Sequence, residues 1–342
     1  ETSDEFLRAA GKVIRKGYGF PSVFNADGVV EQMVRVGKSL DDARGGGTSG
    51  CVETGAFGKE AYILTGYLNL PKILEIALNN GCDPVTGKSI GVKSGAVETF
   101  QNFDDVLQAF DIQLRHFVDG KLAGNRMFEE LYASHMPAPF LSTVIDDCIQ
   151  NATDYNAGGA RYNTRYLQGV GIGTISDSLA AIKKHVFDDR SIAFPALLEA
   201  LHSNFETDGL LRARLRNTSA HYGNDDEAAD TIMCEVFERV FAAIDGIPTQ
   251  CGGTYHVAML PTTCHIYFGS VCGASADGRL AGQPLSEGIS PVQGTDRKGP
   301  TAVLRSAAKM DQRKTGGTLL NLKLMPNLVK GEAGALRLGH LI

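Results

Sequence analysis

The sequence lacks the features that mark membrane and nucleic-acid-binding proteins. None of its apolar runs approaches the roughly 18 residues that a membrane span needs, and no secretory signal pattern is visible. Lys and Arg form no block, and 33 of them stand against 39 Asp and Glu, a formal net charge of −6 at pH 7. This balance argues against a nucleic-acid groove and against binding to an anionic membrane surface, so we expect neither partner.

Cysteine pairs at zinc-binding spacing are also missing. The seven cysteines are an odd number without a Cys-x-x-Cys pair, which argues against a disulfide framework and against a zinc site. We therefore expect a reducing cytoplasm as the compartment. Apolar helical patterns around Cys148 and Cys234 predict buried, inert thiols, whereas Cys51 lies in a glycine-rich segment.

The length of 342 residues fits about two domains of roughly 150 residues, or one large α/β or barrel domain. Periodicity and capping residues predict helices over 71–78, over 103–132 in two parts around Gly120, over 179–186 after a Ser176 cap, and over 225–244. Shorter runs predict strands at 257–260, 265–268 and 318–324. Helices alternating with short strands indicate an α/β fold whose loops carry the function.

The most unusual stretch is the glycine-rich segment 44–55 (RGGGTSGCVETG). Its glycines make physical sense where a chain turns tightly or carries a side chain into a confined site. Cys51 and Glu53 are two residues apart and would share one face of an extended strand. A neighbouring carboxylate raises the pKa of a thiol, so the pair fits a neutral thiol that handles a hydrogen atom beside a carboxyl group that moves protons. On the residues alone, a plain turn cysteine stays open.

Several segments together resemble the glycyl radical enzymes. Residues 42–44 (DAR) followed by 49–53 (SGCVE) are similar to the cysteine loop of this family. Further segments match the family's pattern in the expected order: 19–25, 169–173 with 177–184, 277–279, 286–291 and 299–304. The resemblance covers essentially the whole chain. It implies part of the family's ten-stranded α/β barrel, with the catalytic cysteine on an interior loop.

The cysteine loop also separates branches of this family. Formate acetyltransferase carries two adjacent cysteines there, whereas here Gly50 precedes the single Cys51. Residues 53–67, 158–166 and 260–269 most resemble the trans-4-hydroxy-L-proline dehydratases. Diol dehydratases, choline trimethylamine-lyases and arylacetate decarboxylases stay open as alternatives, as does a member described only generically as a formate acetyltransferase.

The resemblance implies radical chemistry at Cys51. In the family a protein-based glycyl radical, installed by an activating enzyme that uses S-adenosylmethionine and an iron–sulfur cluster, takes a hydrogen atom from the loop cysteine. The Cys51 thiyl would then abstract hydrogen from C5 of hydroxyproline, and Glu53 would act as general acid toward the 4-hydroxyl, giving Δ1-pyrroline-5-carboxylate. Tyr67 and Thr262 match the family's substrate-binding tyrosine and threonine. The resemblance further implies a homodimer, an anaerobic setting, and neither a metal nor a directly bound cofactor.

The family's radical loop, Arg-Val-x-Gly-Tyr, does not occur in these residues. We therefore expect residues 1–342 to be an internal portion of the pyruvate formate-lyase-like barrel domain, without the N-terminal part of the barrel and without the C-terminal glycine radical domain. A chain of these residues alone is then expected to be catalytically inactive.

Other functions stay open on the residues alone. The run 168–173 (QGVGIG) before a helix is similar to a dinucleotide-binding turn, but it lacks the third glycine of that motif, and close packing is the preferred interpretation. Cys264 with His265, and Cys251 with His256, match no standard metal-ligand spacing, so packed core or pocket residues are preferred. A non-catalytic binding protein has no motif in its favour.

Overall fold

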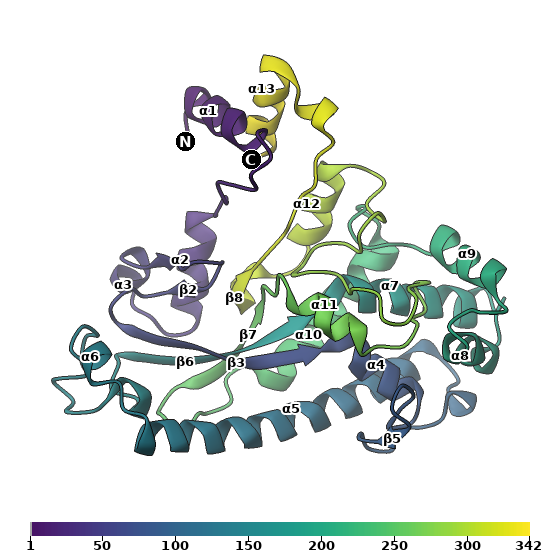
Figure 1. Ribbon diagram of the computed structural model, residues 1–342, viewed down its shortest axis with the longest axis horizontal. Helices are drawn as coiled ribbons and strands as arrows, with labels where there is room; N and C mark the ends of the chain where they lie inside the picture. Colours follow the sequence, from purple (N-terminus) through teal and green to yellow (C-terminus); the bar gives the residue numbers. More distant parts are fainter. Residues whose placement is uncertain (1) are drawn as a thin grey trace.

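A parallel sheet lies at the centre of the computed structural model, which describes residues 2–342 (Figure 1). Within these residues the sheet has four strands in the order β3-β6-β7-β8, and each neighbouring pair is parallel. The strands are β3 (Glu60–Asn69), β6 (Tyr162–Val170), β7 (Thr254–Met259) and β8 (Thr315–Thr318). Two short hairpins add β1 (Gly47–Thr48) with β2 (Thr54–Gly55), and β4 (Cys82–Asp83) with β5 (Lys88–Ser89). The predicted α/β class is confirmed.

Helices connect the strands and flank the sheet (Figure 1). In chain order they are α1 (Asp4–Ile14), α2 (Ala26–Arg35), α3 (Leu40–Arg44), α4 (Leu70–Leu78), α5 (Phe103–His135), α6 (Pro139–Ser142), α7 (Ile172–Ile182), α8 (Phe194–His202), α9 (Gly209–Thr218), α10 (Glu227–Ile244), α11 (Cys264–Ser270), α12 (Pro300–Ala308) and α13 (Gly331–Leu341). A π-helical turn (Lys183–Asp188) extends α7, and 3-10 turns lie at Val97–Thr99, Tyr155–Ala157, Gln312–Lys314 and Pro326–Val329.

One face of the sheet is covered by helices. Leu68, Leu167 and Val257 come from three neighbouring strands and join one large apolar cluster with buried side chains of α4, α5, α7, α8 and α10. Pro71 near the start of α4 and the Asn102 capping box of α5 fix where these helices begin. Burial of this face supplies most of the hydrophobic stabilisation of the fold.

Loops and short elements cover the opposite face. On that face the rings of Tyr62 and Tyr166 stack with centroids 4.1 Å apart, and they pack against residues of the β1–β2 hairpin and of the segments that follow β7 and β8. Side chains alternate along a strand, so the same strands supply the core to one face and this second surface to the other.

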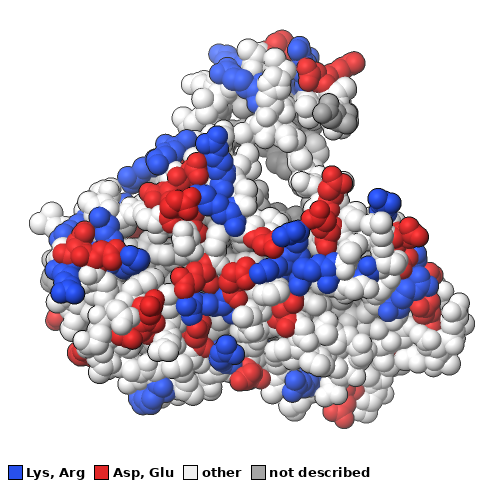
Figure 2. All heavy atoms as spheres, turned by 180° about the vertical axis from the view of Figure 1, so that it is seen from behind, with Lys and Arg blue, Asp and Glu red and all other residues white. Residues whose placement is uncertain are grey.

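The helices α1 and α13 pair with each other away from the sheet (Figure 1). A Cβ on Gly11 would lie 2.6 Å from the carbonyl oxygen of Ala335, so glycine permits this close crossing. Figure 2 shows acidic and basic side chains mixed over the rear face of the molecule. Among residues 2–342, no helix has both the length and the apolar character that crossing a membrane requires.

Two helix predictions need correction. Residues 103–135 form one helix rather than two, because Gly120 sits where no neighbouring atom lies within 4 Å and the buried stripe continues on both sides of it. The helix predicted after Ser176 begins earlier, at Ile172, behind a left-handed Gly171. Every residue of α7 is buried, so its pattern carries no amphipathic signal that marks the start. The helices at 71–78 and 225–244 are confirmed.

Two strand predictions are wrong in whole or in part. Residues 265–268 lie in α11, whose buried residues His265 and Gly269 are four apart, the spacing of a helix. The strand predicted at 318–324 overlaps the observed strand β8 (Thr315–Thr318) only at Thr318, and residues 319–324 form no strand. The glycines in β8 let other groups approach closely: a Cβ on Gly316 would lie 1.9 Å from the Tyr166 ring.

Candidate active site

The glycine-rich segment forms a finger-shaped hairpin with Cys51 at its tip. Strands β1 and β2 pair antiparallel, and the Ser49 amide donates to the Glu53 carbonyl oxygen at 2.8 Å, which closes the tip. Cys51 is exposed in the middle of this tip. A Cβ on Gly46 would lie 2.3 Å from the carbonyl oxygen of Gly55, so the hairpin depends on glycine at that position.

The Glu53 side chain turns back toward Cys51. Its Oε2 accepts a hydrogen bond from the Ser49 hydroxyl at 2.6 Å and from the Cys51 backbone amide at 3.3 Å. A cavity of about 320 Å³ lies against this carboxylate and is bounded on the sheet by Tyr62 and Leu64. The thiol and the carboxyl group therefore share one tip, as their spacing in the sequence predicts.

Ion pairs tie the two ends of the hairpin segment to the fold. Asp42, just before the segment, bonds to Lys59, just after it, and accepts a hydrogen bond from the Tyr162 hydroxyl at 2.7 Å. The bonds from Lys59 and Tyr162 hold the pKa of Asp42 well below its usual range. Glu60, the residue after Lys59, forms a second and buried ion pair: its Oε1 lies 2.9 Å from Lys38 Nζ. These two ion pairs, one residue from each side of the hairpin in each, reduce the conformational entropy of the glycine-rich segment.

Val52 fixes the tip onto the loop-covered face of the sheet. It is 7% exposed and packs with Tyr166, Ala258 and Leu260. Gly317 in β8 has φ +140°, and a Cβ there would lie 2.4 Å from the Val52 carbonyl oxygen. The backbone of β8 can thus support the tip directly only because position 317 carries no side chain.

A β-bulge turns Tyr67 toward the same face. Leu64 pairs with Tyr166 and Tyr67 pairs with Gln168, so Thr65 is the extra residue between them. Without the bulge, strict alternation would send residues 64 and 67 to opposite faces. The bulge places both on the face that carries the hairpin, which is a common use of bulges beside active sites.

Tyr67 stands next to the hairpin tip. Its ring meets Phe268 edge-on, with centroids 6.2 Å apart. Burial raises the pKa of the Tyr67 phenol, and the neighbouring Cys264 thiol, Glu53 and Cys51 raise it further. The structure thus brings together three of the four residues that the sequence singles out.

Thr262, the fourth residue, is exposed on the segment that joins β7 to α11. It lies two residues before Cys264, whose thiol adjoins Tyr67. Because the sequence predicted a strand over 265–268, it did not show that Cys264 begins a helix beside Tyr67. The signal was present, because Thr263 at the N-cap is typical of a helix start.

The alternative sites take other roles in the structure. His256 bonds to Asp245 at 2.7 Å and to the Thr254 hydroxyl at 2.8 Å, so it is a hydrogen-bonded core histidine, as preferred. No group of three or more His, Cys, Asp or Glu in the described chain, residues 2–342, could hold a metal ion. A Cβ on Gly171 would lie 2.8 Å from the Pro71 ring, and this contact confirms close packing for the glycine turn.

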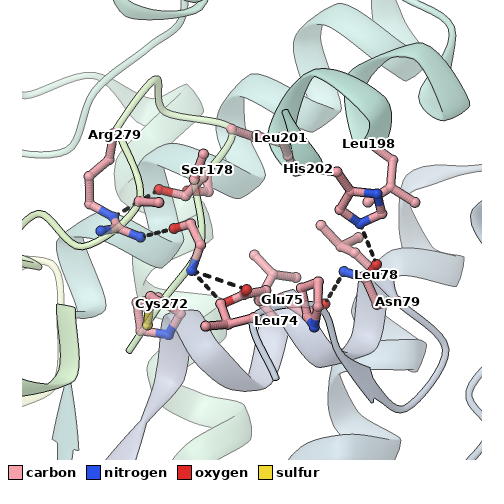
Figure 3. A pocket seen from close by; sticks show the side chains of 18 of the residues that line it. Leu74, Glu75, Leu78, Asn79, Ser178, Leu198, Leu201, His202, Cys272 and Arg279 are labelled. Atoms are coloured by element: carbon pink, nitrogen blue, oxygen red, sulfur yellow. Dashed lines mark hydrogen bonds between the residues drawn. The ribbon is translucent and has the colours of Figure 1, made fainter. Parts of the chain in front are cut away.

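A mainly apolar cavity lies elsewhere in the described residues. It has a volume of about 430 Å³ and is formed by α4, α7, α8 and the segment 272–281 (Figure 3). Its polar groups are already paired: Glu75 accepts from the Gly273 amide at 3.1 Å, and His202 bonds to Asn79 at 2.6 Å. None of the residues predicted to carry chemistry lines it.

Comparisons with known proteins agree with this geometry. The family model for pyruvate formate lyase-like proteins matches residues 1–269, and the glycine radical model matches residues 285–342. Trans-4-hydroxy-L-proline dehydratase of Clostridioides difficile is 52% identical over 342 residues, which is 100% of this chain and 43% of that protein. The chain thus spans less than half the length of this relative.

Solved structures show the same similarity. The crystal structure of hydroxyproline dehydratase from Clostridioides difficile with trans-4-hydroxy-L-proline bound matches with a TM-score of 0.97 and 53% identity, over 99% of this chain and 43% of that one. The B12-independent glycerol dehydratase from Clostridium butyricum, in its glycerol-bound form, matches with a TM-score of 0.95 and 35% identity, over 100% and 43% of the chains.

These likenesses confirm the predicted portion of an α/β barrel and the resemblance to glycyl radical enzymes. Residues 285–342, which match the glycine radical model, fall inside the range predicted as barrel, and the boundaries of the domains stay a prediction. The hairpin of Cys51 and Glu53, the matched family models and the structural neighbours lead to one conclusion. The chain belongs to the pyruvate formate lyase-like family of glycyl radical enzymes.

Proposed function

We propose that the whole protein containing this chain dehydrates trans-4-hydroxy-L-proline to Δ1-pyrroline-5-carboxylate. The observation that carries the proposal is the shared hairpin tip, where the Glu53 carboxylate binds the Cys51 amide beside Tyr67. The 52% identity to a protein named for this activity directs the choice of substrate.

Cys51 is the hydrogen-atom carrier in this proposal. A glycyl radical, installed by an activating enzyme that uses S-adenosylmethionine, supplies the oxidising power when it is present. The exposed position of Cys51 at the end of a finger fits a thiol that must meet both that radical and the substrate. Cys51 takes a hydrogen atom from C5 of the ring, and it returns that atom to C4 after the hydroxyl group has left.

Glu53 moves the protons. Its carboxyl group donates a proton to the 4-hydroxyl, which leaves as water, and a proton released from the ring nitrogen restores the balance. The hydrogen bonds from Ser49 and from the Cys51 amide orient the carboxyl group toward the tip. A fixed acid beside the hydrogen-atom carrier allows C–O cleavage at the carbon next to the radical centre.

Tyr67 and Thr262 bind the substrate in this proposal. Both lie at the carboxyl-end side of parallel strands, Tyr67 near the end of β3 and Thr262 just after β7. This edge of a parallel sheet is where α/β proteins commonly hold their ligands.

The wider setting is part of the same proposal. We infer a cytoplasmic, anaerobic enzyme that forms a homodimer and is activated by a radical S-adenosylmethionine enzyme. Residues 1–342 contribute an internal portion of its barrel domain, and the chain of these residues alone is inactive, because the Arg-Val-x-Gly-Tyr loop does not occur in it.

The test uses the whole protein, activated anaerobically by its activating enzyme and supplied with trans-4-hydroxy-L-proline. We expect formation of pyrroline-5-carboxylate that Cys51→Ser and Glu53→Gln each abolish or reduce by at least about 100-fold. Glu206→Gln, an exposed carboxylate far along the chain, is the matched control and should turn over normally.

Electron paramagnetic resonance separates the possible failures. A glycyl radical signal without turnover would overturn the substrate and leave another C–O, C–N or C–C lyase of the family. Turnover that survives Cys51→Ser would overturn the mechanism. Catalytic activity from residues 1–342 alone would contradict the expected inactivity of this chain.

A further inference from the structure

Ser49 and Glu53 face each other where the hairpin reaches its tip. The register pairs Thr48 with Thr54, so Ser49 and Glu53 are the next pair along the two arms. The Ser49 amide donates to the Glu53 carbonyl oxygen at 2.8 Å, and the Ser49 hydroxyl donates to Glu53 Oε2 at 2.6 Å. The backbone contact thus holds the hydroxyl beside the carboxyl group of its cross-strand neighbour.

The two oxygens of the Glu53 carboxyl group have different surroundings. Oε2 accepts hydrogen bonds from the Ser49 hydroxyl and from the Cys51 amide, at 2.6 and 3.3 Å. Oε1 takes part in no hydrogen bond within residues 2–342. Both donors to Oε2 are uncharged, so neither holds the carboxyl group in its ionised form as a cation would.

The cavity beside the hairpin gives a substrate access to this carboxyl group. Ser49 is exposed and Glu53 half-buried, and both line that cavity of about 320 Å³. Glu60 lines the same cavity, but its oxygens are engaged: Oε1 pairs with Lys38 Nζ at 2.9 Å, and Oε2 accepts from the Ala56 amide at 2.8 Å. Of these two carboxyl groups, that of Glu53 keeps one oxygen free for a ligand.

The hydrogen bonds on Oε2 decide which oxygen carries a proton. A protonated carboxyl group has one hydroxyl oxygen, which donates, and one carbonyl oxygen, which accepts. A backbone N–H can only donate, so the Cys51 amide requires Oε2 to stay an acceptor. With the Ser49 hydroxyl as a second donor, Oε2 is the carbonyl oxygen, and Oε1 carries the proton.

We propose that Ser49 is a positioning residue, which together with the Cys51 amide makes Glu53 Oε1 the oxygen that protonates the leaving 4-hydroxyl group. The inference rests on the proposed function, in which Glu53 is the general acid. The proton moves from Oε1 to the 4-hydroxyl oxygen, the C4–O bond breaks, and water leaves. The proton released from the ring nitrogen restores the balance, and Oε2 keeps both hydrogen bonds throughout.

The contribution of Ser49 is pre-organisation of the acid. The last torsion of a glutamate side chain has a broad, roughly two-fold profile, so a carboxyl group without contacts exchanges its two oxygens readily. The short hydrogen bond from Ser49 fixes this torsion before the substrate reacts. A proton that already points the right way lowers the barrier to its transfer.

The experiment measures turnover of trans-4-hydroxy-L-proline by the activated whole protein, with rates expressed per glycyl radical. The variants are Ser49→Ala, which removes the hydroxyl, and Ser49→Thr, which keeps it. Ser134→Ala, at an exposed position of α5, is the matched control. Isotope effects on kcat are measured for deuterium at C5 of the substrate and for heavy water as solvent.

We expect Ser49→Ala to lower kcat by about 10- to 30-fold and to leave KM within about twofold, because Ser49 acts through the acid. Ser49→Thr should stay within about threefold of wild type, and Ser134→Ala should match it. Since proton donation becomes the slow step in Ser49→Ala, the solvent isotope effect should rise and the C5 isotope effect should not. Normal glycyl radical yield checks that the variants fold.

Three results would overturn the inference and leave the proposed function intact. An unchanged kcat in Ser49→Ala, or an equal loss in Ser49→Thr, would show that the hydroxyl does not serve the acid. A C5 isotope effect that rises while the solvent effect stays constant would mean slower hydrogen-atom transfer by Cys51, and Ser49 would be a structural part of the hairpin. A wild-type protein that carries the radical but does not turn over hydroxyproline overturns the proposed function, and this inference with it.

Discussion

The two faces of the central sheet are built from the same strands but differ in kind. On the helix-covered face, Leu68, Leu167 and Val257 pack among buried aliphatic side chains of five helices. On the loop-covered face, Tyr67 and Gln168 are paired neighbours on β3 and β6, and the glycine-rich hairpin carries an exposed thiol at its tip. Burial of apolar area stabilises the first face, whereas the second holds polar groups that the fold alone leaves unpaired.

The difference shows where stability and chemistry are separated in this protein. Alternation along each strand assigns successive residues to opposite faces, so a substitution at one residue tests the fold and at the next tests the site. Val52 belongs to both, because it packs on the sheet and holds the tip in place. Substitutions on the helix-covered face should therefore change the stability of the protein, and substitutions on the loop-covered face should change its turnover.

The largest effect is expected from Cys51→Ser on the loop-covered face. Turnover by the activated whole protein should fall below about one part in 10⁴ of wild type, because no other group at the tip can carry the hydrogen atom. The melting temperature should not change, since the Cys51 side chain is exposed. A drop of several degrees on this substitution would show that the two faces are not separate.

The next largest effect is a loss of stability, with turnover retained, from a substitution on the helix-covered face. Leu179 in α7 is fully buried in the main cluster, so Leu179→Ala should cost about 2–5 kcal/mol of unfolding free energy. Chemical denaturation of the whole protein measures this cost. Turnover per glycyl radical should stay within about twofold of wild type. A large loss of turnover at full radical yield would contradict the separation.

Val52→Ala should change both properties. The lost methyl groups should cost about 1 kcal/mol of stability, and the loosened tip should reduce turnover by about tenfold with the glycyl radical yield unchanged. Steady-state kinetics with radical quantification separates the two effects. Loss of stability with normal turnover would mean that β8 alone positions the tip.

The smallest effect is a pH dependence confined to the helix-covered face. Asp177 Oδ2 lies 2.9 Å from His221 Nδ1, and burial raises the pKa of Asp177 to about 6. Burial lowers the pKa of His221, but the hydrogen bond and the charge of Asp177 outweigh it and leave that pKa above 6.5. Both groups thus bind their protons more tightly in the folded state.

A group whose pKa is higher in the folded than in the unfolded state stabilises the fold at pH values below its unfolded-state pKa. This stabilisation is lost as the pH rises through its folded-state pKa. For Asp177 that window runs from 3.8 to about 6, and for His221 it begins at 6.5. The melting temperature should therefore fall as the pH rises from 6.5, and His221→Gln should flatten this slope. An equal slope in the variant would assign the effect to other groups.

The sequence was most informative where a residue type is itself unusual. The glycines around Cys51 predicted a finger, and the spacing of Cys51 and Glu53 predicted a shared site, because both depend only on local chemistry. The helices at 71–78 and 225–244 followed from caps and periodicity for the same reason. The resemblance to a family then added Tyr67 and Thr262.

What the sequence could not show depends on contacts between distant segments. The bulge at Thr65 appears only in the pairing of β3 with β6, yet it decides that Tyr67 faces the hairpin. Gln168 lies in an ordinary strand, and nothing in the sequence around it marks that its side chain is buried, with 1% exposed. Residues 265–268 are a short, mostly apolar run that fits either a strand or a helix, and tertiary packing selects the helix α11.

The most direct test of the central claim follows the hydrogen atom that Cys51 is proposed to carry. Trans-4-hydroxy-L-proline with two deuterium atoms at C5 is given to the activated whole protein in ordinary water, and the product is reduced at once to proline with borohydride. The account predicts proline with two deuterium atoms, one of them moved to C4 by Cys51. Proline with a single deuterium, and hydrogen from water at C4, would contradict it.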